Sequence, residues 1–236
     1  MTEPVVFLPG MMCDARLFGP QIAELSHERS VMVAPVCVGE RIEEMASNIL
    51  TSAPQKFALA GLSMGGIVAM EVLRRAPDRI TRIALMDTNC LSETPQVAAA
   101  REPQIVRVKT GQLAEVMRDE MKPNYLADGP YRDAVMELVM DMALSLGPEV
   151  FIRQSRALQR RKDQQRTLRQ IKVPTLVMCG RHDQLCPVKR HEFMAEFIPH
   201  AQLRVIESAG HLPTLEAPEE TMLALREWLA QPYVLQ

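Results

Sequence analysis

A serine framed by two glycines is the residue of this 236-residue chain best placed to do chemistry. Gly61, Ser63 and Gly65 follow a short apolar run, residues 56–60, and precede a helical pattern. At a sharp strand-to-helix turn a positive φ pushes a serine hydroxyl outward, and the glycines let strand and helix pass closely. The same pattern also arises by chance in loops rich in Gly and Ser. Its setting predicts that Ser63 is an acyl-transfer nucleophile.

A serine nucleophile needs a base, and histidine is the usual one at neutral pH. Of the five histidines, His211 directly follows the last expected strand. We expect His27, His191 and His200 to be surface residues, and His182 to point away from the acid beside it. The alternative for His211 is a loop histidine that caps the next helix. The sequence therefore favours His211 as the base.

The base in turn needs a carboxylate at its second ring nitrogen, to fix its tautomer and stabilise its cation. Asp183 stands just beyond an expected strand, and the chain order Ser63, Asp183, His211 is nucleophile, acid, base. Asp87 also ends a strand at the same edge and is the rival, although a strand-end Asp is commonly a cap or turn former. Chain order favours Asp183.

Two backbone amides are needed to stabilise the oxyanion of a tetrahedral intermediate. The amide of Met64 lies where the helix N-terminus favours negative charge, and the second donor is expected in the loop at Pro9-Gly10, from Met11. The alternative for this loop is an ordinary turn with core methionines. Met12, together with Met11, Met64 and Met86, could also form an apolar substrate-binding pocket, although such methionines are more often core.

The elements that position these residues alternate along the chain. Near-continuous apolar runs are typical of parallel strands that are buried on both faces. Helical patterns separate them, which indicates a parallel sheet between two helix layers, with catalytic groups at the carboxyl ends of the strands. The expected strands are Val5–Leu8, Val31–Val36, Lys56–Ala60, Ile80–Met86, Thr175–Cys179 and Leu203–Ile206. The expected helices are Arg16–Ser26, Arg41–Thr51, Met64–Arg75, Pro187–Phe197 and Pro218–Leu229.

The alternation breaks once, over residues 91–170, where the sequence is helical and charged and lacks a convincing strand. We interpret this segment as a helical cap inserted over the strand ends of a single domain, residues 1–236. Its expected helices are Gln96–Lys109, Gln112–Met121, Tyr131–Leu146 and Glu149–Arg161. Arg153, Arg156 and Arg160 share a helical face that could receive an anionic group, although a solvated face is the more common reading.

Composition narrows the class of protein. An apolar content of 47% is ample for one core, and the formal charge of −2 gives no reason to expect nucleic acid or an anionic membrane as partner. The N-terminus lacks the features of a signal peptide, and no apolar run is long enough to span a bilayer. Five scattered cysteines have no spacing suited to a metal. We expect a soluble, cytoplasmic protein that uses no metal or cofactor.

Three motifs in this order resemble the α/β-hydrolase superfamily. Besides the Gly61–Gly65 motif, residues 171–183 look like the family's acid-bearing strand and loop, and residues 208–220 look like its histidine loop and final helix. The chain departs from the family in having Pro9-Gly10 where His-Gly is usual and in beginning at what looks like the third strand. We therefore expect a compact mostly parallel six-stranded sheet with helices on both faces.

The resemblance implies a serine esterase or lactonase that acts on a small molecule through an acyl-enzyme. Ser63 would attack, His211 would carry the proton and Asp183 would orient His211. An ester, lactone or thioester with a small to medium apolar acyl group fits this chemistry. The alternatives are a perhydrolase or C–C bond hydrolase with the same three residues, and a non-catalytic binding protein on the same scaffold.

Overall fold

The computed structural model describes residues 2–121 and 124–233, and it has a central six-stranded sheet. All strands are parallel and are ordered β2-β1-β3-β4-β5-β6. They are β1 (Val5–Leu8), β2 (Val31–Val33), β3 (Phe57–Leu62), β4 (Ile80–Met86), β5 (Thr175–Gly180) and β6 (Gln202–Ile206). The expected α/β class and the strand number are confirmed.

Alternate residues along each strand enter two separate hydrophobic clusters, one on each face of the sheet. Val6 and Leu59 pack on one face, whereas Phe7 and Ala58 pack on the other. The first face is covered by α2 (Ile42–Ser52), α3 (Met64–Arg75), α8 (Gln165–Arg169) and α9 (Val188–Phe197). The second is covered by α1 (Gly19–Leu25), α10 (Pro213–Glu216) and α11 (Pro218–Ala230). Burial on both faces explains why the four central strands, β1, β3, β4 and β5, are near-continuously apolar.

Two expected elements, the strand Val31–Val36 and the helix Arg16–Ser26, differ from the structure by more than two residues at one end. The strand ends at Val33, and after one more backbone bond, from the Ala34 amide to the Phe7 carbonyl (3.0 Å), the chain reaches Pro35. The next residue whose backbone groups would face β1 is Val36, and its carbonyl instead accepts a hydrogen bond from Gln154 Nε2 at 3.0 Å, so this edge strand stops. The first expected helix also differs, because a 3₁₀ turn (Ala15–Phe18) precedes α1.

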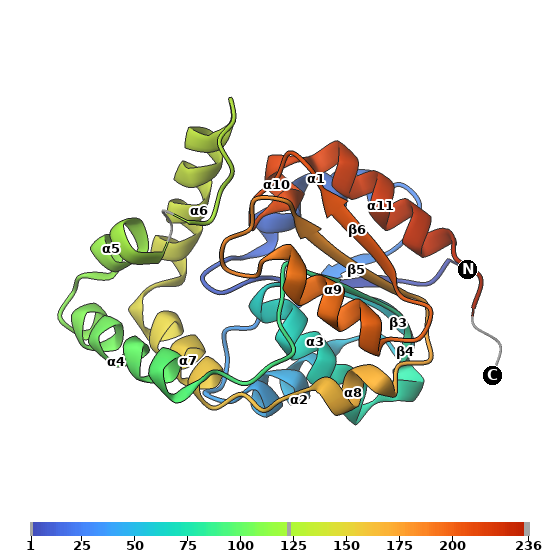
Figure 1. Ribbon diagram of the computed structural model, residues 1–236, viewed down its shortest axis with the longest axis horizontal. Helices are drawn as coiled ribbons and strands as arrows, with labels where there is room; N and C mark the ends of the chain where they lie inside the picture. Colours follow the sequence, from blue (N-terminus) through green and yellow to red (C-terminus); the bar gives the residue numbers. More distant parts are fainter. Residues whose placement is uncertain (1, 122–123, 234–236) are drawn as a thin grey trace.

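All but the last of the helices between β4 and β5 stand to one side of the sheet, beyond its carboxyl edge (Figure 1). They are α4 (Pro95–Lys109), α5 (Leu113–Glu115) with a π-helical continuation (Val116–Met121), α6 (Arg132–Leu146) and α7 (Pro148–Gln159). We call α4 to α7 the helical insertion. The last helix before β5, α8, instead packs against α3 and α9. Within the described residues, no helix is long and apolar enough to cross a membrane.

Candidate active site

Ser63 lies at the turn between β3 and α3 in a strained backbone conformation, with φ 55° and ψ −117°. Such a positive φ is unfavourable for a residue with a side chain and persists only where the surroundings impose it. A Cβ at Gly61 would clash with the carbonyl of Gly65, and a Cβ at Gly65 would clash with the carbonyl of Leu8. Only glycine fits these two positions, which allows β3, α3 and the end of β1 to meet so closely.

Three polar side chains form a continuous hydrogen-bonded line at the carboxyl edge of the sheet. His211 Nε2 lies 2.9 Å from Ser63 Oγ, and His211 Nδ1 lies 2.8 Å from Asp183 Oδ2. The other carboxylate oxygen, Asp183 Oδ1, accepts hydrogen bonds from the amides of Leu185 and Cys186 at 2.8 and 2.9 Å. These bonds hold the carboxylate in one orientation toward the imidazole.

Asp183 is buried, and burial by itself would raise its pKa. The neighbouring His211, through its charge and hydrogen bond, and the two backbone amides outweigh burial and lower the pKa below its ordinary value. Asp183 therefore remains a carboxylate at neutral pH.

The rival acid Asp87 is also buried at this edge, but its polar contact is different. Its Oδ1 accepts a hydrogen bond from the Gly180 amide at 2.9 Å, and Oδ2 has no hydrogen-bond partner among the described residues. Burial, followed by the negative charge of Asp183, raises the pKa of Asp87 well above its ordinary value. The group beside His211 Nδ1 is Asp183.

The loop after β1 lies directly against the serine. A Cβ added to Gly10 would lie 3.3 Å from Ser63 Cβ, so the loop that holds Gly10 and Met11 borders Ser63. No hydrogen-bond partner is found in the described part of the chain for the amide of Met11 or that of Met64. Both amides are therefore free to donate to a bound oxyanion.

Met12, which was expected to bind substrate, does not line the cavity beside Ser63. Its side chain is fully buried, and its amide donates to Gln154 Oε1 at 2.9 Å, so Met12 belongs to the core and we leave it out of the substrate pocket. Met86, at the end of β4, is also fully buried in the core and does not line the cavity. The apolar side chains that do line the cavity include Met11, Met64, Ile67, Met121, Leu158 and Leu185.

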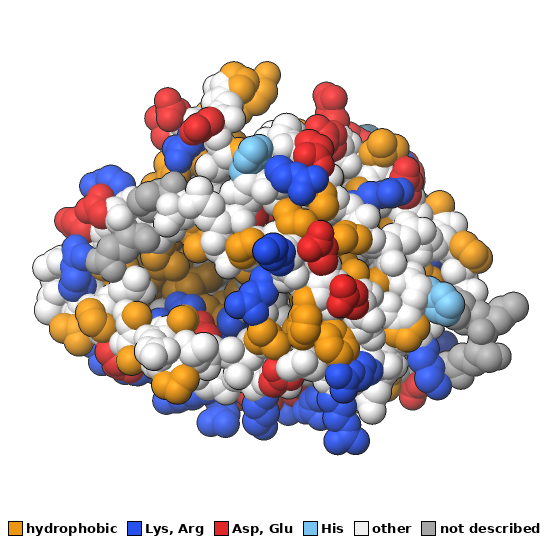
Figure 2. Space-filling model, viewed as in Figure 1, with side chains coloured by type: hydrophobic (Ala, Val, Ile, Leu, Met, Phe, Trp, Pro, Cys, Tyr) orange, Lys and Arg blue, Asp and Glu red, His pale blue; other side chains and the backbone are white. Residues whose placement is uncertain are grey.

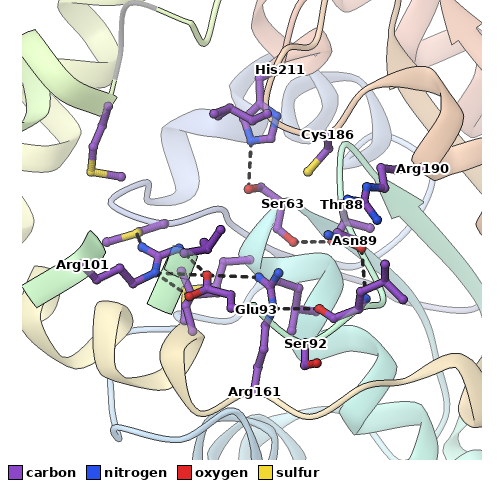
Figure 3. Close-up of a pocket in the computed structure, with 18 of the residues that line it drawn as sticks. Ser63, Thr88, Asn89, Ser92, Glu93, Arg101, Arg161, Cys186, Arg190 and His211 are labelled. Atoms are coloured by element: carbon purple, nitrogen blue, oxygen red, sulfur yellow. Dashed lines mark hydrogen bonds and ion pairs between the residues drawn. The ribbon is translucent and has the colours of Figure 1, made fainter. Parts of the chain in front are cut away.

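A cavity of about 570 Å³ opens above Ser63, between the core and the helical insertion. Figure 2 shows its mouth, with hydrophobic side chains deep inside and both positively and negatively charged side chains at its lower edge. In Figure 3, His211 lies on one side of Ser63, and Arg101, Glu93 and Arg161 lie together on the other. The cavity is large enough for a small ligand.

The expectation that His191 is a surface residue is wrong. Its side chain is fully buried on α9, and Nε2 accepts a hydrogen bond from the Thr88 amide at 3.0 Å. Thr88 Oγ1 in turn donates to the Ser63 carbonyl at 2.7 Å, so His191 supports the backbone of Ser63 through Thr88. The sequence held a signal, because His191 is spaced three residues from Val188 and from Met194 on one face of the helix.

Segment 125–127 of the helical insertion and Glu216 hold the histidine loop, and neither role was anticipated from the sequence. The His211 amide donates to the Tyr125 carbonyl at 2.6 Å, and the two rings meet edge to face at 5.1 Å. Glu216 accepts hydrogen bonds from the amides of Ala127, Gly210 and Leu212 at 2.7, 3.0 and 2.8 Å. The loop that carries His211 is thus tied to the insertion above it.

Among the described residues, one group of side chains that could bind a metal ion includes Asp183 and His211. Ligand atoms of Asp183, Cys186 and His211 lie within 4.8 Å of one another. Burial raises the pKa of the Cys186 thiol well above its ordinary value, which disfavours the thiolate that binds zinc. Asp183 and His211 already bond to each other, so these two residues fit the hydrogen-bonded line to Ser63 better than a metal site.

The sequence model of the alpha/beta hydrolase family matches residues 5–224. This chain belongs to that family. Among curated relatives of this α/β hydrolase are pimeloyl-[acyl-carrier protein] methyl ester esterases. That of Aliivibrio salmonicida is 26% identical over 79% of this chain and 74% of its own length. That of Aromatoleum aromaticum is 26% identical over 80% of each.

Solved structures agree with this assignment. A thermophilic esterase from Thermogutta terrifontis, determined with malate bound, superposes on this α/β hydrolase with a TM-score of 0.89. It is 30% identical, over 97% of this chain and 90% of its own. An enol-lactonase from Burkholderia xenovorans has a TM-score of 0.87 at 22% identity, covering 98% of this chain and 92% of its own, and shows the shared fold.

Proposed function

We propose that this α/β hydrolase cleaves carboxylic esters through an acyl-enzyme on Ser63. The observation that carries the proposal is the line from Ser63 Oγ to His211 Nε2 (2.9 Å) and from His211 Nδ1 to Asp183 (2.8 Å). It begins at a strained residue beside a cavity, as an activated nucleophile requires. The relatives named as esterases support ester hydrolysis as the class of reaction.

In this mechanism Ser63 Oγ attacks the carbonyl carbon of the ester while His211 Nε2 takes the hydroxyl proton. Asp183 holds the proton on Nδ1, so that Nε2 is the free base, and stabilises the imidazolium that forms. The amides of Met11 and Met64 donate to the oxyanion.

Collapse of the tetrahedral intermediate breaks the bond to the alcohol, which leaves with the proton from His211. Water then attacks the acyl-enzyme with His211 again as base, and this second step releases the carboxylic acid and restores Ser63. No cofactor is required at any step.

A fluorophosphonate probe tests the nucleophile, because it reacts covalently with an activated serine hydroxyl. We expect wild-type protein to be labelled and to hydrolyse p-nitrophenyl esters, and we expect Ser63→Ala to lose both properties, with a rate lower by about 10⁶-fold. The matched control is Ser92→Ala, which removes a hydroxyl elsewhere in the cavity lining.

Equal labelling of wild type and Ser63→Ala would contradict the proposal, and so would absence of labelling in native protein. A series of esters, lactones and acyl thioesters then identifies the substrate class. Activity only with peroxide or with a diketone would favour the perhydrolase or C–C bond hydrolase alternative instead.

A further inference from the structure

The cavity above Ser63 contains more positive than negative charge. Its lining includes the side chains of Arg101, Arg161 and Arg190, whereas Glu93 is the only carboxylate among the described residues that line it. Arg101 comes from α4, Glu93 from the segment after β4, and Arg161 from the segment after α7. Charges from three separate parts of the chain therefore converge within one half-enclosed, partly apolar space (Figure 3).

Arg101 already neutralises Glu93. Arg101 Nε lies 3.1 and 3.0 Å from the two carboxylate oxygens, and Nη2 lies 2.6 Å from Oε1. The Glu93 side chain is only 2% exposed, so water contributes little to its solvation. A carboxylate and a guanidinium joined in this forked geometry satisfy one another.

Arg161 is a second cation near the Glu93 carboxylate. Because Arg101 already neutralises Glu93, no further carboxylate among the described residues of the cavity lining balances the charge of Arg161. Its Nη1 is 3.7 Å from Glu93 Oε1, which is beyond hydrogen-bond distance, and its Nε donates to the Leu91 carbonyl at 3.0 Å. Neither terminal nitrogen of Arg161 makes a hydrogen bond to any residue that the structure describes. The side chain is 11% exposed, and burial lowers its pKa, so its charged form is poorly solvated.

The basic helical face expected from the sequence, formed by Arg153, Arg156 and Arg160, does not place its charge in the cavity. Arg156 pairs with Glu102 and Arg160 with Glu40, and Arg153 donates to the Cys37 carbonyl. Those three arginines have partners outside the cavity, in agreement with the reading as a solvated face. Of Arg153, Arg156, Arg160 and Arg161, only Arg161 lines the cavity.

We propose that the ester cleaved by this enzyme carries a carboxylate distant from the scissile bond, and that Arg161 binds it. The inference rests on the function proposed above, and it specifies the substrate class of the same site. A guanidinium offers paired N–H donors that match the two oxygens of a carboxylate. An anion there balances the charge that Arg161 brings into the cavity.

A pair of isosteric substrates tests this binding role. Monomethyl adipate ends in a carboxylate, and the methyl ester of adipic acid monoamide ends in a neutral amide of the same shape. We expect wild type to have a kcat/KM at least about 10-fold higher for the charged ester. In Arg161→Gln this ratio should fall about 10- to 100-fold. In the matched control Arg156→Gln, on α7 but outside the cavity, the ratio should change little.

A second pair places the carboxylate on the leaving group. It compares the acetate ester of 4-hydroxybutyrate with that of 4-hydroxybutyramide, and it shows whether the acyl or the alcohol part carries the anion. Preference for the charged member of either pair, lost in Arg161→Gln, supports the proposal. A ratio near one in both pairs, or equal ratios in Arg161→Gln and wild type, overturns it.

A further test uses wild-type protein alone, so that its outcome does not depend on whether Arg161→Gln folds correctly. Adipate should inhibit hydrolysis of p-nitrophenyl acetate competitively, with an inhibition constant at least about 10-fold lower than that of adipamide. Equal inhibition would overturn the proposal. If wild type hydrolyses p-nitrophenyl acetate and is labelled at Ser63 but shows no preference for anions, only this inference fails. If neither labelling nor hydrolysis occurs, the proposed function fails as well.

Discussion

Two buried carboxyl groups, Asp87 and Asp183, lie at the same edge of the sheet, yet their surroundings give them opposite ionisation. Asp183 bonds to His211 and to two amides, which lowers its pKa. Asp87 has one amide donor, and burial together with the charge of Asp183 raises its pKa. Only the ionised group can stabilise an imidazolium. The acid and its rival thus differ in their neighbours and not in their burial.

This difference predicts unequal effects of the same isosteric change. Asp183→Asn should lower kcat for a p-nitrophenyl ester by about 10³- to 10⁴-fold, because the amide cannot hold the His211 tautomer. Asp87→Asn should lower it by less than about 10-fold, because Asn resembles the protonated acid and can still accept from Gly180. Steady-state kinetics of both variants measures this. A larger loss in Asp87→Asn than in Asp183→Asn would reassign the acid.

At the scale of elements, the positions of Ser63, Asp183 and His211 follow from the sheet. Ser63 directly follows β3, and Asp183 and His211 lie in the loops after β5 and β6, which end at the same edge of the parallel sheet. Sequence reasoning could therefore bring these residues together through strand order and the glycine pattern. It could not find Glu216 or Tyr125, because their roles depend on backbone contacts between segments about 90 residues apart in the chain.

Glu216, at the end of α10, joins the loop that carries His211 to the helical insertion through hydrogen bonds to the backbone amides of both. In Glu216→Gln one carboxylate oxygen becomes an NH₂ group, which cannot accept from the amides that the carboxylate now binds. A buried amide left unpaired costs about 1–3 kcal/mol, so we expect a lower Tm and a kcat reduced about 10-fold or more through misplaced His211. Thermal unfolding and ester kinetics measure both effects.

Glu219→Gln is the matched control, because Glu219 is an exposed residue in the first turn of α11. It removes a negative charge near the same loop without breaking a bond to the loop. Unchanged kcat in Glu216→Gln, or equal losses in the two variants, would show that Glu216 does not position the base.

Across the whole molecule, the strands and helices of the sheet layers could be predicted from the sequence, whereas the residues that face the cavity or lie buried in the core were predicted less well. Patterns of apolar residues in the sequence predicted the strands and both helix layers, because buried parallel strands are apolar throughout. The patterns did not separate Met11, which lines the cavity, from Met12, which is core, because adjacent residues of one type differ only in where the loop turns them. Buried polar residues such as His191 were missed for a related reason, since polarity alone suggests exposure.

The buried His191 makes global stability depend on pH. Burial lowers its pKa to about 4, with the nearby Asp183 acting in the opposite direction and His211 in the same direction. An unfolded histidine titrates near 6.5, so between pH about 6.5 and 4 the unfolded chain takes up a proton that the folded chain does not. The stabilisation present above pH 6.5 is therefore lost as pH falls through this range. Between pH 7 and 5 the loss from this residue is about 2 kcal/mol.

His191→Gln removes this titration while leaving a side chain that can accept from Thr88. We expect the variant to be less stable than wild type at pH 7, because a buried ring is replaced, and the difference in free energy of unfolding to shrink by about 2 kcal/mol at pH 5. Urea unfolding of both proteins at the two pH values measures the change, and other titrating groups cancel in the comparison. A difference that stays constant or grows on acidification would show that His191 is protonated in the folded state.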